Sequence, residues 1–303
     1  MAVTATATRS STAVQPGAPT RAGRQRLVGL LFVTPFVVVM LAFLVIPLLY
    51  SLWLSLHRTT IIQGEHFSGL DNYVKAFTDP EFLTGVRRVV LFGLVQIPIM
   101  LGVALIAALI LDHMTGRLAK TFRLTLFMPY AVPAVIGTLM WGFLYSPSFG
   151  VIRGVDLFTD NWIMVALGNI VTWQWTGYNM IVLYAALQGL PRDVYEAAAV
   201  DGAGPWRVAW RVKVPMIGSA LVLTTVFAII GTLQFFTEVQ TLRPIAAKAI
   251  SSGFTPNYYA FNMAFQYSEF EYSAAISFAL GAVVFICVYI FLFATRKRGS
   301  FFS

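Results

Sequence analysis

The sequence is poor in charge. Charged residues make up 11% of its 303 residues and hydrophobic residues 58%, whereas a soluble domain carries about 25% charged and about 45–50% apolar residues. So few charges cannot cover the surface of a soluble protein of this size. The composition therefore excludes a water-soluble enzyme and a disordered chain, and it indicates a membrane protein with several spans.

Groups for covalent and metal chemistry are scarce too. Cys287 is the one cysteine, which excludes an intrachain disulfide and a thiolate metal site. The three histidines, His57, His66 and His113, are scattered over expected loops. The patterns GxxxxGK[ST], HExxH and GxSxG do not occur. The sequence therefore predicts no P-loop in this chain, no enzyme, no metal and no cofactor.

Long apolar stretches, by contrast, are abundant. Six of them reach about 20 residues, the length that a helix needs to cross a hydrocarbon core. They contain no Asp, Glu, Lys or Arg, and they run over residues 27–54, 89–111, 124–145, 162–187, 217–237 and 273–295. Because each stretch is continuously apolar rather than alternating, we expect helices and not strands. The sequence thus predicts an all-α membrane protein with six transmembrane helices.

The basic residues predict the orientation of these spans. One side collects the N-terminal tail, residues 112–123 and 188–216, and the C-terminal end, with 14 basic and 4 acidic residues; the other side has 7 basic and 9 acidic residues. Since Lys and Arg accumulate on the cytoplasmic side, both termini are expected in the cytoplasm. We expect residues 1–26 to be a disordered tail, 27–297 the membrane domain and 298–303 a second tail.

The lack of charge inside the spans bears on the driving force. Proton pumps and proton-coupled carriers place ionisable side chains within the membrane. Here Asp112 and Glu238 lie only at the ends of spans. This argues against proton coupling, while sodium coupling through backbone carbonyls stays open.

The cytoplasmic segment 190–215 has the pattern of two short helices joined at a glycine; it reads LPRDVYEAAAVDGAGPWRVAWRVKVP. Asp193 precedes Glu196 by three residues, a capping-box spacing that predicts a helix over 194–200. Gly202 suits the left-handed position that ends a helix. The segment would form a compact knob on the cytoplasmic face.

The second half of this knob carries aromatic and basic residues. Pro205 suits the first position of a helix. Trp206 and Trp210 then lie four residues apart on one face, and the arginines 207 and 211 share the neighbouring face. From the local pattern alone, the segment could be a docking knob for another protein or a solvated loop whose glutamate only caps a helix.

The spacing of this segment resembles the EAA loop of ABC importer permeases. That pattern is EAA, three residues, Gly, nine residues, an apolar residue, one further residue, an apolar residue and Pro. Here it is filled by Glu196-Ala197-Ala198, Gly202, Val212, Val214 and Pro215, with Val in place of the commoner Ile and Leu.

Three further segments resemble the carbohydrate-type members of these permeases. They are Gly69-Leu70-Asp71-Asn72-Tyr73, Phe127-Met128-Pro129-Tyr130 and Ala186-Leu187-Gln188-Gly189-Leu190-Pro191. The resemblance covers residues 27–297 and implies the type I ABC importer fold. It also implies a permease subunit in the bacterial plasma membrane that carries a sugar or oligosaccharide.

The resemblance further implies the partners and the roles of residues. The partners would be a second related permease, a dimer of ATP-binding cassette ATPases and an outer solute-binding protein. The loop would be the coupling helix that docks on the ATPase. Its coupling residues would be Glu196, Ala197, Ala198, Asp201, Gly202, Pro205 and Pro215.

A path for sugar through uncharged spans would use aromatic and neutral polar side chains. The candidates are Trp175, Tyr178, Asn179, Thr232 and Gln234. Tyr178 and Thr232 fall where maltose-type members of the family have sugar-contacting positions. Helix packing, or an interfacial aromatic belt, is the alternative reading for the aromatic residues, and an interhelical hydrogen bond is the alternative for Gln234.

Two other functions are alternatives. A facilitator or channel-like protein that works alone on small polar solutes would have no need of a docking loop. A membrane-embedded enzyme would need catalytic residues that the sequence does not offer.

Overall fold

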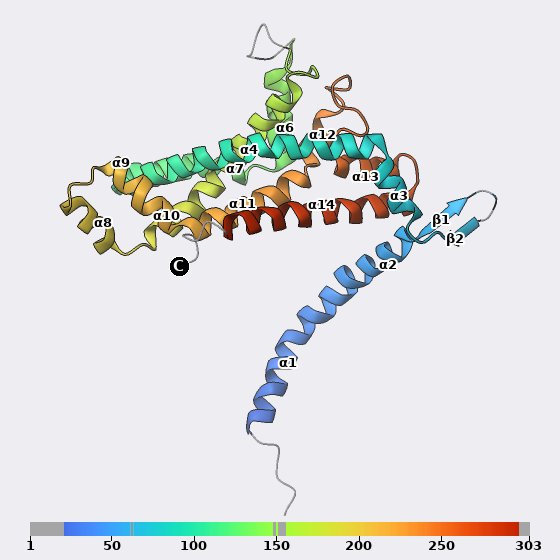
Figure 1. Ribbon diagram of the computed structural model, residues 1–303, viewed down its shortest axis with the longest axis horizontal. Coiled ribbons are helices and arrows are strands. Elements are labelled where there is room, and N and C mark those ends of the chain that lie inside the picture. The colour runs from blue at the N-terminus through green and yellow to red at the C-terminus, as the bar shows by residue number, and fades with distance from the viewer. Residues whose placement is uncertain (1–20, 61, 63, 148–149, 151–155, 297–303) are drawn as a thin grey trace, which may run out of the picture. The chain divides into compact units, whose positions relative to one another are not determined.

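The computed structural model describes residues 21–60, 62, 64–147, 150 and 156–296 of the chain. Residues 1–20 of the expected N-terminal tail and the expected tail 298–303 lie outside the described residues. The chain divides into two units, residues 1–51 and 52–303, which are described one after the other. Both are built mainly of helices, as expected (Figure 1).

The first unit is a long helical segment with one wide turn. It comprises α1 (Arg21–Met40), the π-helical turn η1 (Leu41–Val45) and the start of α2 (Ile46–Ser55). Pro47 follows η1 by two residues; its ring would clash with a carbonyl in a regular α-helix, and the wider turn relieves that clash. The prediction of a disordered tail is wrong for its last six residues, 21–26, because they belong to α1.

The second unit begins with a small hairpin and a short helix in the expected first outer loop. Strands β1 (His57–Thr60) and β2 (Gly64–Phe67) pair antiparallel, with His57 opposite Phe67. The helix α3 (Asp71–Thr78) follows. Asn72 is buried, and its amide donates to the carbonyls of Ser55 (3.0 Å) and His57 (2.8 Å), which fastens α3 to the base of the hairpin.

Helices of different lengths form the body of this unit. They are α4 (Pro80–His113), α5 (Gly116–Ala131), α6 (Ala134–Tyr145), α7 (Ile163–Gln188), α11 (Gly218–Leu233), α12 (Thr237–Leu242), α13 (Pro256–Phe265) and α14 (Phe270–Arg296). Figure 1 places the loop between α7 and α11 and the β1–β2 hairpin at opposite ends of this bundle. The two ends match the two sides that the charge pattern separates.

Among the described residues, four helical segments are long and apolar enough to cross a membrane, and a fifth span results if the bent pair α5–α6 is one. The helix α7 matches the expected fourth span and is 26 residues long, about 39 Å. It is not among those segments. Polar side chains, including Asn169, Gln174 and Asn179, interrupt its apolar character.

The prediction places the start of the second span too far along the chain. The helix α4 begins at Pro80, nine residues before the expected span 89–111. Asp79 is its N-cap, with a side-chain oxygen that accepts from the Glu81 amide at 2.9 Å. Pro at the first helical position and an acid in the first turn favour a helix start here. This local signal outweighs the two arginines, 87 and 88, that the helix then includes.

The expected third span is broken. The helices α5 and α6 meet at an angle of 95°. Val132, between them, is extended (φ −75°, ψ 128°), and Pro133 is the N-cap of α6. The residue before a proline is biased away from the helical region and proline has no amide to donate, so Pro133 favours a break at this point.

The core of the bundle is organised around α4 and α7, which lie side by side (Figure 1). Buried side chains of both helices join those of the loop after α7 in one apolar cluster. The helix α5 approaches α7 closely at Gly177, where a Cβ atom would collide with the carbonyl of Leu126. Small residues at such points let helix backbones approach within a membrane.

A polar brace holds together the end of the bundle that carries the β1–β2 hairpin. Asp79 Oδ2 accepts hydrogen bonds from the hydroxyls of Tyr259 (2.7 Å) and Tyr272 (2.6 Å). Lys75 Nζ lies 3.7 Å from the centre of the Tyr272 ring and 3.1 Å from a carboxylate oxygen of Glu269. Burial and the neighbouring Asp79 carboxylate raise the pKa of Tyr259, which therefore stays a donor. The brace joins α3, α4, α13 and α14.

Candidate functional site

The loop between α7 and α11 forms the predicted pair of short helices. The first, α8, spans Arg192–Val200. It starts two residues earlier than expected, so Asp193 lies in its first turn rather than before it, and the predicted cap at Asp193 is wrong. An acid in the first turn still stabilises the helix through the helix dipole. Glu196 and Ala197 lie in the middle of α8.

The end of α8 has the predicted glycine geometry. Gly202 has φ +81°, a left-handed conformation that side-chain-bearing residues rarely adopt. The Ala203 amide donates to the Ala198 carbonyl at 3.0 Å, which is the long hydrogen bond of a Schellman motif. Asp201 and Gly202 are exposed, as is Ala197, while Ala198 is half-buried. The tip of the knob is therefore open to another protein.

The second short helix starts at the predicted residue. The helix α9 (Pro205–Val208) has Pro205 at its first position and continues into the π turn η2 (Ala209–Lys213) and α10 (Val214–Met216). As in η1, a proline, here Pro215, follows the π turn by two residues. The rings of Trp206 and Trp210 lie 5.4 Å apart, and both are exposed.

Part of the predicted sugar path forms one aromatic group. The rings of Trp175 and Tyr178 on α7 lie 6.0 Å apart and edge to face. Both contact Tyr130 of α5, which stacks on Tyr178 at 4.9 Å and meets Trp175 edge-on at 5.4 Å. Trp175 is 40% exposed, so the group has an open face. Such an arrangement can hold the apolar face of a sugar ring.

The other path candidates are not part of this group: Asn179 is buried, Thr232 lines a separate pocket of about 420 Å³, and Gln234 lies at a helix end. Asn179 is buried, and its amide donates to the Trp175 carbonyl at 2.9 Å. Thr232 is buried where α11 crosses α4, and its methyl group lies 3.2 Å from where a Cβ of Gly93 would be. Gln234 is exposed just after α11. Its backbone carbonyl accepts a hydrogen bond from the side-chain amide of Asn257 at 3.0 Å.

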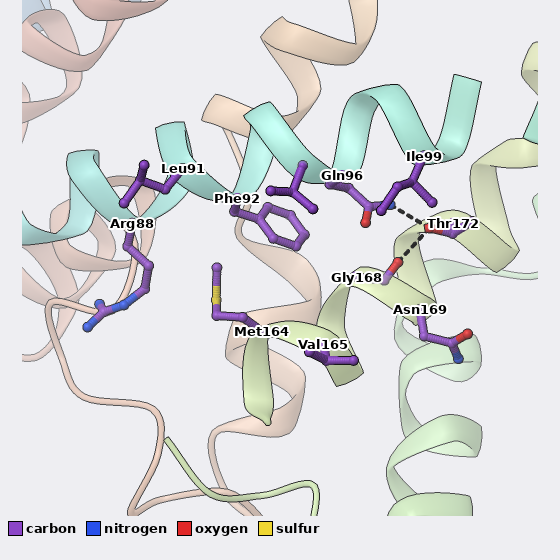
Figure 2. A pocket seen from close by; sticks show the side chains of 11 residues that line it. Arg88, Leu91, Phe92, Gln96, Ile99, Met164, Val165, Gly168, Asn169 and Thr172 are labelled. Carbon is purple, nitrogen blue, oxygen red and sulfur yellow. Dashed lines mark hydrogen bonds between the residues drawn. The ribbon is translucent and has the colours of Figure 1, made fainter. Parts of the chain in front are cut away.

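A pocket of about 620 Å³ lies between α4 and α7 (Figure 2). Its lining is mainly apolar, with Arg88 at one end and Gln96, Asn169 and Thr172 toward the other. There, Gln96 Nε2 donates to Thr172 Oγ1 at 2.6 Å, and Thr172 Oγ1 donates to the Gly168 carbonyl at 2.7 Å. The lining contains none of the predicted path residues.

Residues 100–297, about two thirds of the chain, match the family described as "Binding-protein-dependent transport system inner membrane component". The chain belongs to this family. It is therefore a multi-pass inner-membrane permease, a transport protein rather than an enzyme.

Individual relatives agree with this membership. The permease is 33% identical to the "Lactose transport system permease protein LacF" of Rhizobium radiobacter, over 89% of this chain and 94% of the relative. It is 27% identical to the "Trehalose/maltose transport system permease protein MalF" of Thermococcus litoralis, over 92% and 95%. A solved bacterial ABC transporter "involved in the import of the acidic polysaccharide alginate" has the same fold, with a TM-score of 0.78 at 18% identity over 90% of this chain and 96% of that chain. The type I importer fold is thus confirmed.

Two features of the permease escaped the sequence pattern. Tyr130 was part of a family-like segment, but its stacking on Tyr178 depends on how α5 packs against α7. Lys213 Nζ lies 2.6 Å from Asp112 Oδ2 at the end of α4. The sequence separation of 101 residues hides this pair, because nothing in the local pattern around Lys213 points to Asp112.

Proposed function

We propose that this permease is the membrane subunit of an ATP-driven importer that carries a neutral sugar or oligosaccharide into the cell. The observation that carries the proposal is the knob of α8 and α9, with its left-handed Gly202 and its exposed tip, in a member of the binding-protein-dependent family. The names of relatives support a sugar, since lactose and trehalose or maltose systems are among them.

The proposal includes the assembly. A second related permease, a dimer of ATP-binding cassette ATPases and an outer solute-binding protein would complete the importer. A related alginate transporter has been solved "in complex with alginate pentasaccharide-bound periplasmic protein", which supports an outer binding protein here. ATP hydrolysis would be the task of the partner ATPase and would reach the permease through segment 190–215.

The proposal also includes the topology. Six spans within 27–297, with both termini in the cytoplasm, fit the charge distribution and the placement of the coupling knob and the hairpin at opposite ends of the bundle. The knob would dock through Glu196, Ala197, Ala198, Asp201 and Gly202, with Pro205 and Pro215 fixing the turns on either side of α9 and η2.

Solute would pass along the aromatic group of Trp175, Tyr178 and Tyr130. Its rings are neutral and partly open, as a carbohydrate path requires. Thr232, Asn179 and Gln234 would contribute neutral hydrogen-bonding groups once the helices rearrange during transport.

The test is uptake by vesicles that contain the complete complex, supplied with labelled lactose, trehalose or maltose. Wild type should import one of them only with ATP and binding protein present. Glu196→Lys and Gly202→Pro should abolish uptake while ATP hydrolysis continues. Gly204→Ser is the matched control, because Gly204 has φ −67° and Ser suits the N-cap that it occupies. Sugar flux without ATP would instead identify a facilitator that works alone.

A further inference from the structure

The ion pair of Asp112 and Lys213 lies where water hardly reaches. Their side chains are 9% and 7% exposed, and the two charged atoms are 2.6 Å apart. Leu111, next to Asp112 in the chain, and Ile217, whose amide donates to the Lys213 carbonyl, belong to one buried apolar cluster. In such surroundings a charge interaction is strong, and an unpaired charge is costly.

The pair has two further contacts, and each comes from a different element. Gln188, the last residue of α7, donates from Nε2 to Asp112 Oδ1 at 2.7 Å. The ring centre of Tyr195, in α8, lies 4.5 Å from Lys213 Nζ, a cation–π contact. One carboxylate and one ammonium group therefore connect the ends of α4 and α7 with both halves of the coupling knob.

Stability alone does not account for this arrangement. Asp112 is the penultimate residue of α4, where a negative charge opposes the helix dipole. Replacing a buried ion pair by apolar side chains of similar volume often leaves a protein equally stable or more stable. What the pair supplies, and apolar packing would not, is a directional link between particular atoms of separate elements.

We propose that Asp112 and Lys213 position the coupling knob and pass its movement to α4. The chain itself connects the knob to α7 and α11, but not to α4. Beside the apolar cluster that α4 shares with this segment, the pair supplies a directional polar connection to α4. Because α4 packs against α7, α11 and α13, a push on the knob would then reach the whole bundle rather than one helix. This inference rests on the proposed coupling role of segment 190–215.

The test compares sugar molecules imported per ATP hydrolysed in vesicles with the complete complex, using the labelled disaccharide that wild type imports. Lys213→Met and Asp112→Asn should each lower this ratio about tenfold, which is within the range of factors that coupling between two sites usually produces. The double variant should be no worse than either single one, since residues that act as a pair are not additive. Lys120→Met, an exposed lysine on the cytoplasmic end of α5, should keep the wild-type ratio.

Two variants leave the ion pair intact and guard against a folding defect. Tyr195→Leu removes the ring that faces Lys213 and should lower the ratio, whereas Tyr195→Phe keeps the ring and should not. Wild-type ratios in Lys213→Met and Asp112→Asn complexes of normal yield would overturn the inference. If those complexes do not assemble, equal ratios for the two Tyr195 variants would overturn it. A failure of the proposed function would be visible separately, as wild type that imports no sugar.

Discussion

Asp79 is a single residue on which several contacts converge, at the end of the bundle that carries the β1–β2 hairpin. Its carboxylate caps α4 through the Glu81 amide and accepts hydrogen bonds from Tyr259 and Tyr272. The sequence Asp-Pro-Glu is enough to predict the cap. It does not predict the tyrosine hydrogen bonds, because the two tyrosines are separated from Asp79 by 180 and 193 positions in the chain. Local chemistry could thus be predicted here, and the tertiary brace could not.

Replacing Asp79 should destabilise the protein according to how much acceptor capacity is lost. Asp79→Ala should lower the free energy of unfolding by about 1–3 kcal/mol, because it removes the cap and leaves two tyrosine hydroxyls without their acceptor. Asp79→Asn should cost less, since Asn also caps helices. Thermal unfolding in detergent measures both. Asp156→Ala, which removes one exposed loop contact to the Phe158 amide, should have little effect; an equal loss there would contradict the role of the brace.

The same carboxylate should make the protein acid-sensitive. Burial raises the pKa of Asp79, but hydrogen bonds from Tyr272, Tyr259 and the backbone outweigh burial and hold the pKa below its ordinary value. Its contribution to stability is therefore complete above the unfolded pKa of about 3.9 and is lost as pH falls through the folded pKa. As pH falls below about 4, wild type should lose stability more steeply than Asp79→Asn. Parallel pH curves for the two proteins would rule this out.

Among the elements, the contact between α5 and α7 depends on the absence of a side chain at Gly177. Gly177→Ala would place a methyl group against the Leu126 carbonyl, so α5 must shift. We expect a loss of about 1–3 kcal/mol in stability, as for other overpacked sites, and a disturbed stack of Tyr130 on Tyr178. Gly102→Ala on α4 is the control, because a Cβ there meets nothing within 4 Å. Unfolding temperatures and tyrosine fluorescence of both variants check the prediction.

The elements also show which signals in the sequence were sufficient. The coupling knob was predicted nearly residue by residue, because glycine and proline impose their conformations locally at Gly202 and Pro205. Hydropathy was a weaker guide. It started the second span at residue 89 instead of Pro80, and it did not reveal the 95° bend between α5 and α6 within the expected third span. A break of this size needs the packing of both halves, which composition does not contain.

For the whole molecule, the charge pattern predicts which loops face the cytoplasm, and the bend between α5 and α6 makes this testable. A broken helix of this kind could cross the membrane or return to the side from which it came. If it crosses, residue 161 lies on the outer side together with residue 62; if it returns, residue 161 lies in the cytoplasm together with residue 118. The charge pattern favours crossing.

Single cysteines in a Cys287→Ser background can separate the two topologies. Ile62→Cys, Leu118→Cys and Asn161→Cys all replace exposed residues outside the long spans, and Ile62 and Leu118 are 95% and 69% exposed. A membrane-impermeant maleimide added to intact spheroplasts should label positions 62 and 161 but reach 118 only after lysis. Labelling of 161 only after lysis would make α5 and α6 a re-entrant loop. The span count of six and the sidedness of every later loop would then be wrong, including that of the coupling knob.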